Sequence, residues 1–246
     1  MTDEVRGVSE RLRRFVAEAP YERRSILQFV QSCARSLPAG ARLADVGAGD
    51  SPYRELFAHC EYISLDWAQS VHPGAANADI ISSADSIALP DESVDGALLT
   101  QVLEHVPSPS AVLAEVGRVL RPDGHVFLTV PLIWELHELP HDYFRYTPAS
   151  LHLLLGRAGF LDIKVMPRND CFTTIAQLML NAGGAMGRAG DERDAERDRV
   201  CQALNELSDS IAALAPLDVL RIMPLGYSVI ARRGREPNPE SARDLP

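Results

Sequence analysis

The stretch LADVGAGDSPY, residues 43–53, joins a short apolar run to a turn rich in glycine. The apolar run predicts a buried strand, and glycines at its end let the backbone approach a ligand closely. A helix after the turn would offer its free N–H groups to that ligand. Pro52 stands where the dinucleotide fingerprint G-x-G-x-x-G requires a glycine. The stretch therefore predicts a ligand site that differs from a nicotinamide dinucleotide site.

Two acidic residues indicate which ligand the turn suits. Asp45 lies two positions before the first glycine, where a carboxylate would suit an ammonium group better than a pyrophosphate. Asp66 ends the next predicted strand, and an aspartate at that place can accept both hydroxyls of a ribose. The pattern predicts a ligand with a ribose, a cationic amino acid portion and no diphosphate.

Predicted strands and helices alternate on both sides of this stretch. The strands lie at 41–46, 62–66, 94–100, 126–130, 160–166 and 226–231. Apolar residues at helical spacing predict helices over 5–16, 26–37, 110–120 and 147–156, with Thr147 as a cap, Pro148 at the first helical position and a turn at 121–124. Such alternation predicts an α/β fold, a Rossmann-like, doubly wound and mostly parallel sheet with helices on both faces.

Three parts of the chain are distinguished by this pattern. Residues 1–40 form N-terminal helices that we expect to pack on or cover the active site, and residues 41–233 form the main domain. The main domain contains a helical insertion, 172–215, before the last strand, and residues 234–246 form a flexible tail. The apolar first part of the insertion, 172–187, is open to four interpretations: a cover over the substrate, a contact with another subunit in a homodimer, a membrane-surface segment, or an ordinary packed helix.

Composition argues against several classes of protein, without excluding a local basic face. The formal net charge of −10 argues against a nucleic-acid partner, because affinity for nucleic acid depends largely on cationic side chains. The four cysteines are scattered and form no C-x-x-C pair, so a zinc ribbon and a disulfide framework are not expected. The chain begins without a signal-peptide pattern and has no apolar run long enough to span a membrane, so we expect a cytoplasmic protein without a transmembrane segment.

The order of these motifs resembles the class I S-adenosylmethionine-dependent methyltransferases. The resemblance covers roughly residues 41–167 and the last strand, GYSVIARR. LADVGAGD is similar to the first motif of the family, and ADSIALPDESVDGALLTQVLEHV and EVGRVLRPDGHVFLTVP are similar to the blocks that follow it. The resemblance implies a seven-stranded sheet with an antiparallel last strand. It also implies S-adenosylmethionine as the cofactor and S-adenosylhomocysteine as its product.

The resemblance also implies which residues bind the cofactor. Asp66 would bind the ribose, the following Trp67 would pack on the adenine, and Asp85 would accept from the adenine amino group. Ser86 would supply a backbone contact, and Gln101 would lie at the mouth of the site. Together with the residues of the first turn, the predicted cofactor set is Asp45, Gly47, Gly49, Asp66, Trp67, Asp85, Ser86 and Gln101.

Residues 137–141, HELPH, match the H-E-x-x-H signature of zinc proteases. That signature works because two histidines four residues apart share one face of a helix. Pro140 removes a backbone donor and disfavours helical geometry at Leu139, so the match does not predict a protease. No metal centre is predicted, although His137, His141 and Asp142 form a loop cluster of plausible metal ligands.

The segment PLIWELHELPHDYFRYT, residues 131–147, follows a parallel strand and therefore begins at the edge of the sheet where ligands bind. Its aromatic side chains predict a small-molecule pocket. Its predicted substrate-binding residues are Trp134, Tyr143, Arg145 and Tyr146. The predicted catalytic residues are His141 as the base, Asp142 as its orienting partner or a substrate contact, and His137 as a rival base, with His105 as a further rival. Alternatively, Asp142 and Arg145 form a structural ion pair that fixes the loop.

Three functions compete at this stage. The first is transfer of a methyl group to a small-molecule or glycan-linked acceptor, with a hydroxyl as the acceptor group. The loop HELPHDYFRYT resembles a bacterial subgroup, methyltransferase type 11-like, that is associated with polysaccharide assembly, and this resemblance implies a saccharide acceptor. The second is a catalytically silent, methyltransferase-like subunit that binds cofactor or acts as a scaffold. The third is a nicotinamide-dependent oxidoreductase, against which Pro52 and Asp45 argue.

Overall fold

The structure, a computed structural model, describes residues 7–188, 194–218 and 221–235. Its strands are β1 (Arg42–Val46), β2 (Glu61–Asp66), β3 (Ile80–Ile81), β4 (Val94–Thr100), β5 (Leu120–Pro131), β6 (Phe160–Arg168) and β7 (Gly226–Arg233). Its α-helices are α1 (Glu10–Ala17), α2 (Pro20–Ser36), α3 (Pro109–Val119), α4 (Pro148–Arg157), α5 (Cys171–Arg188) and α6 (Asp194–Ala212). Short 3-10 helices span Arg54–Phe57, Pro73–Asn77, Leu103–His105 and Ala215–Leu217.

The strands form one seven-stranded sheet in the order β3-β2-β1-β4-β5-β7-β6. All neighbouring pairs are parallel except those of β7, which runs antiparallel to both β5 and β6. The strand order reverses between β1 and β4, and in open α/β sheets ligands bind at this reversal, beyond the carboxyl ends of the strands. The predicted doubly wound, seven-stranded α/β fold is therefore confirmed.

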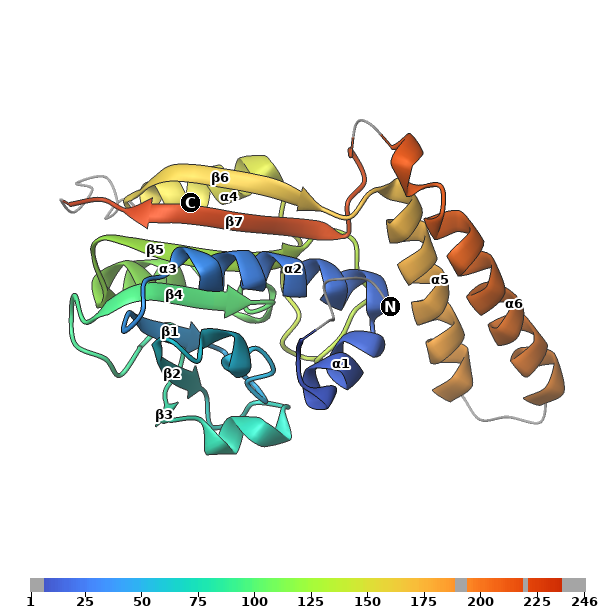
Figure 1. Ribbon diagram of the computed structural model, residues 1–246, viewed down its shortest axis with the longest axis horizontal. Helices are drawn as coiled ribbons and strands as arrows, with labels where there is room; N and C mark the ends of the chain where they lie inside the picture. Colours follow the sequence, from blue (N-terminus) through green and yellow to red (C-terminus); the bar gives the residue numbers. More distant parts are fainter. Residues whose placement is uncertain (1–6, 189–193, 219–220, 236–246) are drawn as a thin grey trace.

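Helices cover both faces of the sheet, and each face buries its own apolar core (Figure 1). On one face α1 and α2 bury residues such as Leu12, Leu27 and Val30 against Leu43 and Phe127. On the other face α3 and α4 pack against apolar side chains of the sheet. The N-terminal helices pack on the sheet, and α1 and α2 contribute no side chain to the main cavity. The side that carries the cavity is formed by loops and not by these helices.

The predicted insertion before the last strand is a pair of helices, α5 and α6, that projects beyond the end of the sheet (Figure 1). The two helices pack on each other, and α5 also contacts α2. The side-chain oxygen of Gln177 on α5 accepts the backbone N–H groups of Tyr21 and Glu22 in the first turn of α2, which has no cap of its own. None of the helices in the described ranges is long and apolar enough to cross a membrane.

Several element boundaries differ from the sequence prediction. Helix α2 begins at Pro20 and not near residue 26, because proline suits the first turn of a helix. The predicted turn at 121–124 lies inside β5, where Val94 pairs with Leu120 but Gly96 pairs with His125, so it forms an irregularity of the strand. Thr147 caps α4 through a capping box with Ser150, as predicted. Part of the first predicted helix, residues 1–6, and most of the predicted tail, residues 236–246, lie outside the described residues.

Candidate functional site

A cavity of about 320 Å³ lies beyond the carboxyl ends of β1, β2 and β4. Its volume falls at the lower end of the range that small-molecule sites in proteins occupy. Predicted site residues that line it are Gly47, Asp66, Trp67, Asp85, Gln101, His105, His141 and Tyr143. It is also lined by residues that the sequence did not single out for the site, namely Val71, His72, Ser82, Ser83, Ala84, Val102, Val106, Pro107 and Glu138. Both predicted regions, the glycine turn and the loop after β5, therefore meet in one cavity.

The glycine turn is held close against the end of β4. Gly47 has a φ of +71°, which L side chains rarely adopt. A Cβ atom at Gly47 would lie 2.6 Å from Cγ2 of Val102, which also lines the cavity. The backbone N–H groups of Gly47 and Ala48 both donate to the carbonyl of Leu65. Glycine is therefore required here by both the backbone angle and the close approach of β4.

The turn is not followed by the α-helix that the sequence predicted. A 3-10 helix of only four residues, Arg54–Phe57, lies between β1 and β2. A diphosphate site of the Rossmann type depends on the N-terminus of a full helix, whose N–H groups bind the phosphates. In addition, the N–H of Gly49 donates to the Asp66 carboxylate at 2.6 Å. The structure thus gives a second reason, besides Pro52, against a nicotinamide dinucleotide.

Asp66 lies in the cavity wall, where two backbone hydrogen bonds fix its carboxylate. Its side chain ends β2, is 5% exposed and accepts two backbone N–H groups, from Gly49 at 2.6 Å and from Trp67 at 2.8 Å. Each carboxylate oxygen accepts one of these bonds and keeps a second lone pair for another donor. This pair of acceptor oxygens fits a vicinal diol, because the two oxygens are fixed in orientation and can accept one hydroxyl each.

Asp45 does not line the cavity, although its place before the glycine turn predicted a contact with the ammonium group of the ligand. It is 1% exposed and accepts the hydroxyl of Tyr62, which stands on the neighbouring strand β2. Its other oxygen, Oδ1, has no hydrogen-bond partner among the described residues. Burial raises the pKa of Asp45 to about 7; the Tyr62 hydroxyl opposes this shift, and the charge of Asp66 adds to it. Asp45 therefore lies beneath the glycine turn, with its side chain enclosed by protein.

We expect the Asp45→Asn variant to gain stability over the wild type as pH rises. The folded wild type keeps Asp45 protonated up to about pH 7, whereas the unfolded chain ionises it near its ordinary pKa of about 3.9. The free energy of unfolding of the wild type therefore falls between these two pH values, and asparagine abolishes this fall. Urea denaturation at pH 4.5 and pH 7.5 should show the difference between the two proteins growing by on the order of 2 kcal/mol. A difference independent of pH would contradict the buried position of Asp45.

The remaining predicted cofactor residues divide between the cavity and its surroundings. Trp67 is 36% exposed in the cavity wall, where its ring meets that of His141 edge to face at 5.3 Å. Asp85 lines the cavity and accepts the hydroxyl of Ser83. Gln101 lines it as well, and its side-chain nitrogen donates to Thr129 at 2.9 Å. Ser86 lies outside the lining, and its N–H, predicted to contact the ligand, donates to the carbonyl of Ser83.

The loop after β5 is attached to the end of β4 by hydrogen bonds between distant parts of the chain. The carbonyl of Glu104 accepts the N–H groups of Tyr143 at 2.8 Å and Phe144 at 3.3 Å. The Nδ1 atom of His105 donates to the carbonyl of His141 at 2.7 Å. These bonds place His141 and Tyr143 in the cavity wall, with Nδ1 of His141 3.2 Å from the hydroxyl of Tyr143. Tyr143, and not Asp142, is thus the side chain that can orient His141.

Asp142 is part of an ion pair, as the alternative interpretation of the sequence proposed. Its fully buried side chain accepts both terminal nitrogens of Arg145, at 2.6 and 2.9 Å, and the N–H of His137 at 3.0 Å. The Arg145 guanidinium holds the pKa of the Asp142 carboxyl well below its usual range. Arg145 also donates to the carbonyls of Trp134 and Glu135. The assignments of Asp142 as the partner of His141 and of Arg145 as a substrate contact are corrected accordingly, because both side chains are used in fixing the loop.

Two further predicted substrate residues lie away from the cavity. Tyr146 is 3% exposed in the apolar core, and its hydroxyl donates to the carbonyl of Leu103 at 2.6 Å. Trp134 is outside the cavity lining and contacts the Arg145 guanidinium through its carbonyl. The aromatic composition of the loop therefore predicted more pocket residues than the structure has, because the Tyr146 ring packs in the core. His137 also lies outside the lining, beside His105, with 4.6 Å between the ring centroids.

Glu138 and His72 form a contact across the cavity that the sequence did not predict. Nε2 of His72 lies 3.3 Å from the Glu138 carboxylate, and the two residues come from opposite segments of the lining. The hydrogen bond to Glu138 raises the pKa of His72. Residues 137–141 form an irregular loop and not a helix, so the zinc-protease interpretation is excluded by geometry. The signal that could have found Glu138 was its place in the loop that follows β5.

The chain is similar to known methyltransferases over part of its length. A family model described as a methyltransferase domain matches residues 44–128. The ubiquinone biosynthesis O-methyltransferase of Xanthomonas axonopodis pv. citri is 30% identical over 136 residues, which cover 48% of this chain and 57% of that protein. The chain spans 39% to 57% of the length of the first curated relatives that it matches.

Solved structures share the fold at low sequence identity. A S-adenosylmethionine-dependent methyltransferase from Archaeoglobus fulgidus superposes with a TM-score of 0.54 at 19% identity, covering 89% of this chain and 99% of the other. The [4+2]-cyclase SpnF superposes with a TM-score of 0.56 at 21% identity, covering 87% and 82%. The matched domain contains the glycine turn, Asp66 and the end of β4. Residues 44–128 are thus similar to a methyltransferase domain, and the chain has the fold of S-adenosylmethionine-dependent methyltransferases.

Proposed function

We propose that this protein transfers the methyl group of S-adenosylmethionine to a hydroxyl of a small-molecule or glycan-linked acceptor. The observation that carries the proposal is the composition of the single cavity at the strand-order reversal. One part of its wall holds the Asp66 carboxylate, fixed by two backbone N–H groups, beside an exposed indole, Trp67. Another part of the same wall holds an imidazole and a phenol, His141 and Tyr143. The first part suits a nucleoside, and the second suits proton transfer from an acceptor.

The residues of the chain have separate tasks in this proposal. The bound cofactor supplies an electrophilic methyl group on a sulfonium. Asp66 fixes the ribose, and the Trp67 ring packs on the adenine, so that the nucleoside is held in one orientation. His141 accepts the proton of the acceptor hydroxyl through Nε2, which is unprotonated when Nδ1–H of His141 donates to the Tyr143 hydroxyl oxygen.

Two observations support a hydroxyl as the acceptor. A histidine in the cavity wall suits an acceptor that must lose a proton, because imidazole exchanges protons near neutral pH. The relative from Xanthomonas axonopodis pv. citri is named as an O-methyltransferase. The saccharide as acceptor is supported by the resemblance of the loop at residues 137–147 to the polysaccharide-associated subgroup. The fold does not decide the reaction, since a cyclase has a similar one.

Two measurements test the proposal. Isothermal titration should show that S-adenosylhomocysteine binds and that NAD gives no heat. Incubation of the protein with a cell-envelope extract and isotopically labelled S-adenosylmethionine, followed by mass spectrometry, should show label on small or glycan-linked hydroxyl compounds. Label found only on protein or RNA would overturn the acceptor class. Binding of S-adenosylhomocysteine without any labelled product from the envelope or the small-molecule fraction would instead support the silent, cofactor-binding subunit.

A further inference from the structure

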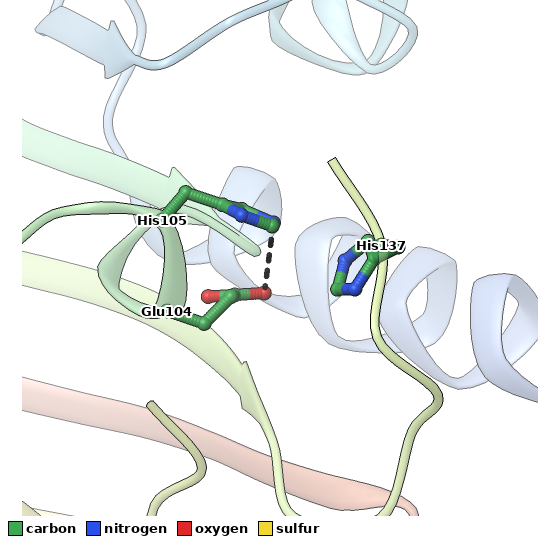
Figure 2. A group of neighbouring side chains, drawn as sticks. All are labelled: Glu104, His105 and His137. Atoms are coloured by element: carbon green, nitrogen blue, oxygen red, sulfur yellow. Dashed lines mark ion pairs between the residues drawn. The ribbon is translucent and has the colours of Figure 1, made fainter. Parts of the chain in front are cut away.

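Glu104, His105 and His137 converge from two segments that are distant in the sequence (Figure 2). Glu104 and His105 belong to the short 3-10 helix after β4, and His137 belongs to the loop after β5. One potential ligand atom from each side chain lies within 4.8 Å of the others. Nε2 of His105 is 3.9 Å from Oε1 of Glu104, and Figure 2 shows the His137 ring facing this pair. Each ligand atom would need to move by about one ångström or less to reach the bond length of about 2 Å to a common ion.

The Glu104 carboxylate is fully buried and has no hydrogen-bond donor. Its side chain is 0% exposed, and neither Oε1 nor Oε2 has a hydrogen-bond partner among the described residues. Burying a charged carboxylate without a partner costs several kcal/mol, so a carboxyl that stays charged when buried is normally paired or bound to a metal ion. The Arg145 guanidinium, whose charge acts on Glu104, is already bound to both oxygens of Asp142. A cation between Glu104 and the two histidines would supply the missing partner.

Hydrogen bonds on both histidines prepare them as metal ligands. Nδ1 of His105 lies 2.7 Å from the carbonyl of His141, which can only accept, so Nδ1 carries the proton. Nδ1 of His137 lies 3.2 Å from the carbonyl of Glu135 and 3.4 Å from the Asp142 carboxylate, and these are also acceptors. Nε2 of each neutral ring is therefore left with a lone pair. Histidines that bind metals characteristically donate their other N–H to a carbonyl or carboxylate in this way.

We propose that Glu104, His105 and His137 bind a divalent transition-metal ion of the zinc type. Two imidazoles and one carboxylate are a ligand set that suits Zn²⁺, Co²⁺ or Fe²⁺ better than Mg²⁺, which prefers oxygen ligands. Three protein ligands leave at least one coordination position for water or another oxygen. Because His105 also lines the main cavity, this position would lie beside the cavity. Metal binding itself requires neither the cofactor nor the acceptor of the proposed function.

The test uses the full-length protein, freed of metal by a chelator, in the absence of any cofactor. Titration with Zn²⁺ should give one bound ion per chain, and titration with Co²⁺ should give visible absorption bands typical of tetrahedral or five-coordinate cobalt. Glu104→Gln and His137→Gln should each weaken the binding by about a hundredfold or more, since each removes a direct ligand. His152→Gln is the matched control, because His152 is an exposed histidine on α4 and should leave binding unchanged.

Free thiols are the main alternative zinc ligands in this chain. X-ray absorption of the zinc-loaded wild type separates the two cases without a variant: the proposal requires two imidazoles, only nitrogen and oxygen neighbours, and no sulfur. This measurement also holds if Glu104→Gln or His137→Gln fails to fold. A sulfur neighbour, undiminished binding in both variants, or a wild type that binds neither Zn²⁺ nor Co²⁺ would overturn the proposal. None of these results depends on whether methyl transfer occurs.

Discussion

The Asp66→Ala variant is expected to bind S-adenosylhomocysteine about a hundredfold to ten-thousandfold more weakly than the wild type. Each hydrogen bond to a charged group contributes about 1.5–3 kcal/mol, and the proposal gives Asp66 two such bonds, one to each ribose hydroxyl. The carboxylate also holds the N–H of Gly49 at 2.6 Å, so its removal frees the glycine turn that forms part of the cavity. Isothermal titration of the purified variant measures the loss directly.

Two comparisons make the result specific to this position. Asp91→Ala removes an acidic side chain that is 73% exposed and pairs with Arg118 away from the cavity, and it should leave the affinity unchanged. Circular dichroism should show that Asp66→Ala retains the secondary structure of the wild type. An affinity within about threefold of the wild type, in a folded variant, would mean that Asp66 does not bind the ribose, because even one lost charged hydrogen bond would exceed that change.

The parts of the fold that the sequence predicted are those that depend on neighbouring residues. The run at 43–46 and the glycines at 47 and 49 predict a strand and a turn by themselves, and the structure has β1 and the turn there. Thr147 and Pro148 likewise define the start of α4 locally. The prediction of an α-helix after the glycine turn was wrong, because no strong helical pattern follows the turn. A short 3-10 helix, Arg54–Phe57, stands in its place.

The predictions for the loop after β5 were limited by contacts that join distant residues. Its aromatic composition indicated a pocket, but which side chains face that pocket depends on bonds such as the one from Tyr143 to the carbonyl of Glu104. Tyr146, from the same loop, is instead buried in the apolar core, where its hydroxyl donates to the carbonyl of Leu103. Spacing along the chain cannot show that His137 lies beside Glu104 and His105, since 32 residues separate His137 from His105 and the loop path is set by the Asp142–Arg145 pair. The metal ligands proposed here therefore became visible only in the structure.

The His141→Ala variant is expected to bind S-adenosylhomocysteine like the wild type but to transfer methyl groups about a hundredfold to ten-thousandfold more slowly. A positioned general base contributes an effect of this size. Alanine retains the backbone carbonyl that accepts the Nδ1–H of His105, so the attachment of the loop to β4 is preserved. Initial rates with labelled S-adenosylmethionine and the acceptor found in the envelope extract measure the change, at saturating concentrations of both substrates.

Two further variants test whether His141 acts as the general base or only lines the cavity. Tyr143→Phe removes only the hydroxyl that lies 3.2 Å from Nδ1 of His141, so it should slow transfer less than His141→Ala and leave cofactor binding intact. His152→Ala, on the exposed side of α4, should change neither. If His141→Ala lost cofactor affinity and transfer in equal measure, its edge-to-face contact with Trp67 would explain the effect, and His141 would be a wall residue. Equal transfer rates in His141→Ala and the wild type would leave proton removal to another group, and His105, which also faces the cavity, would be the next residue to replace.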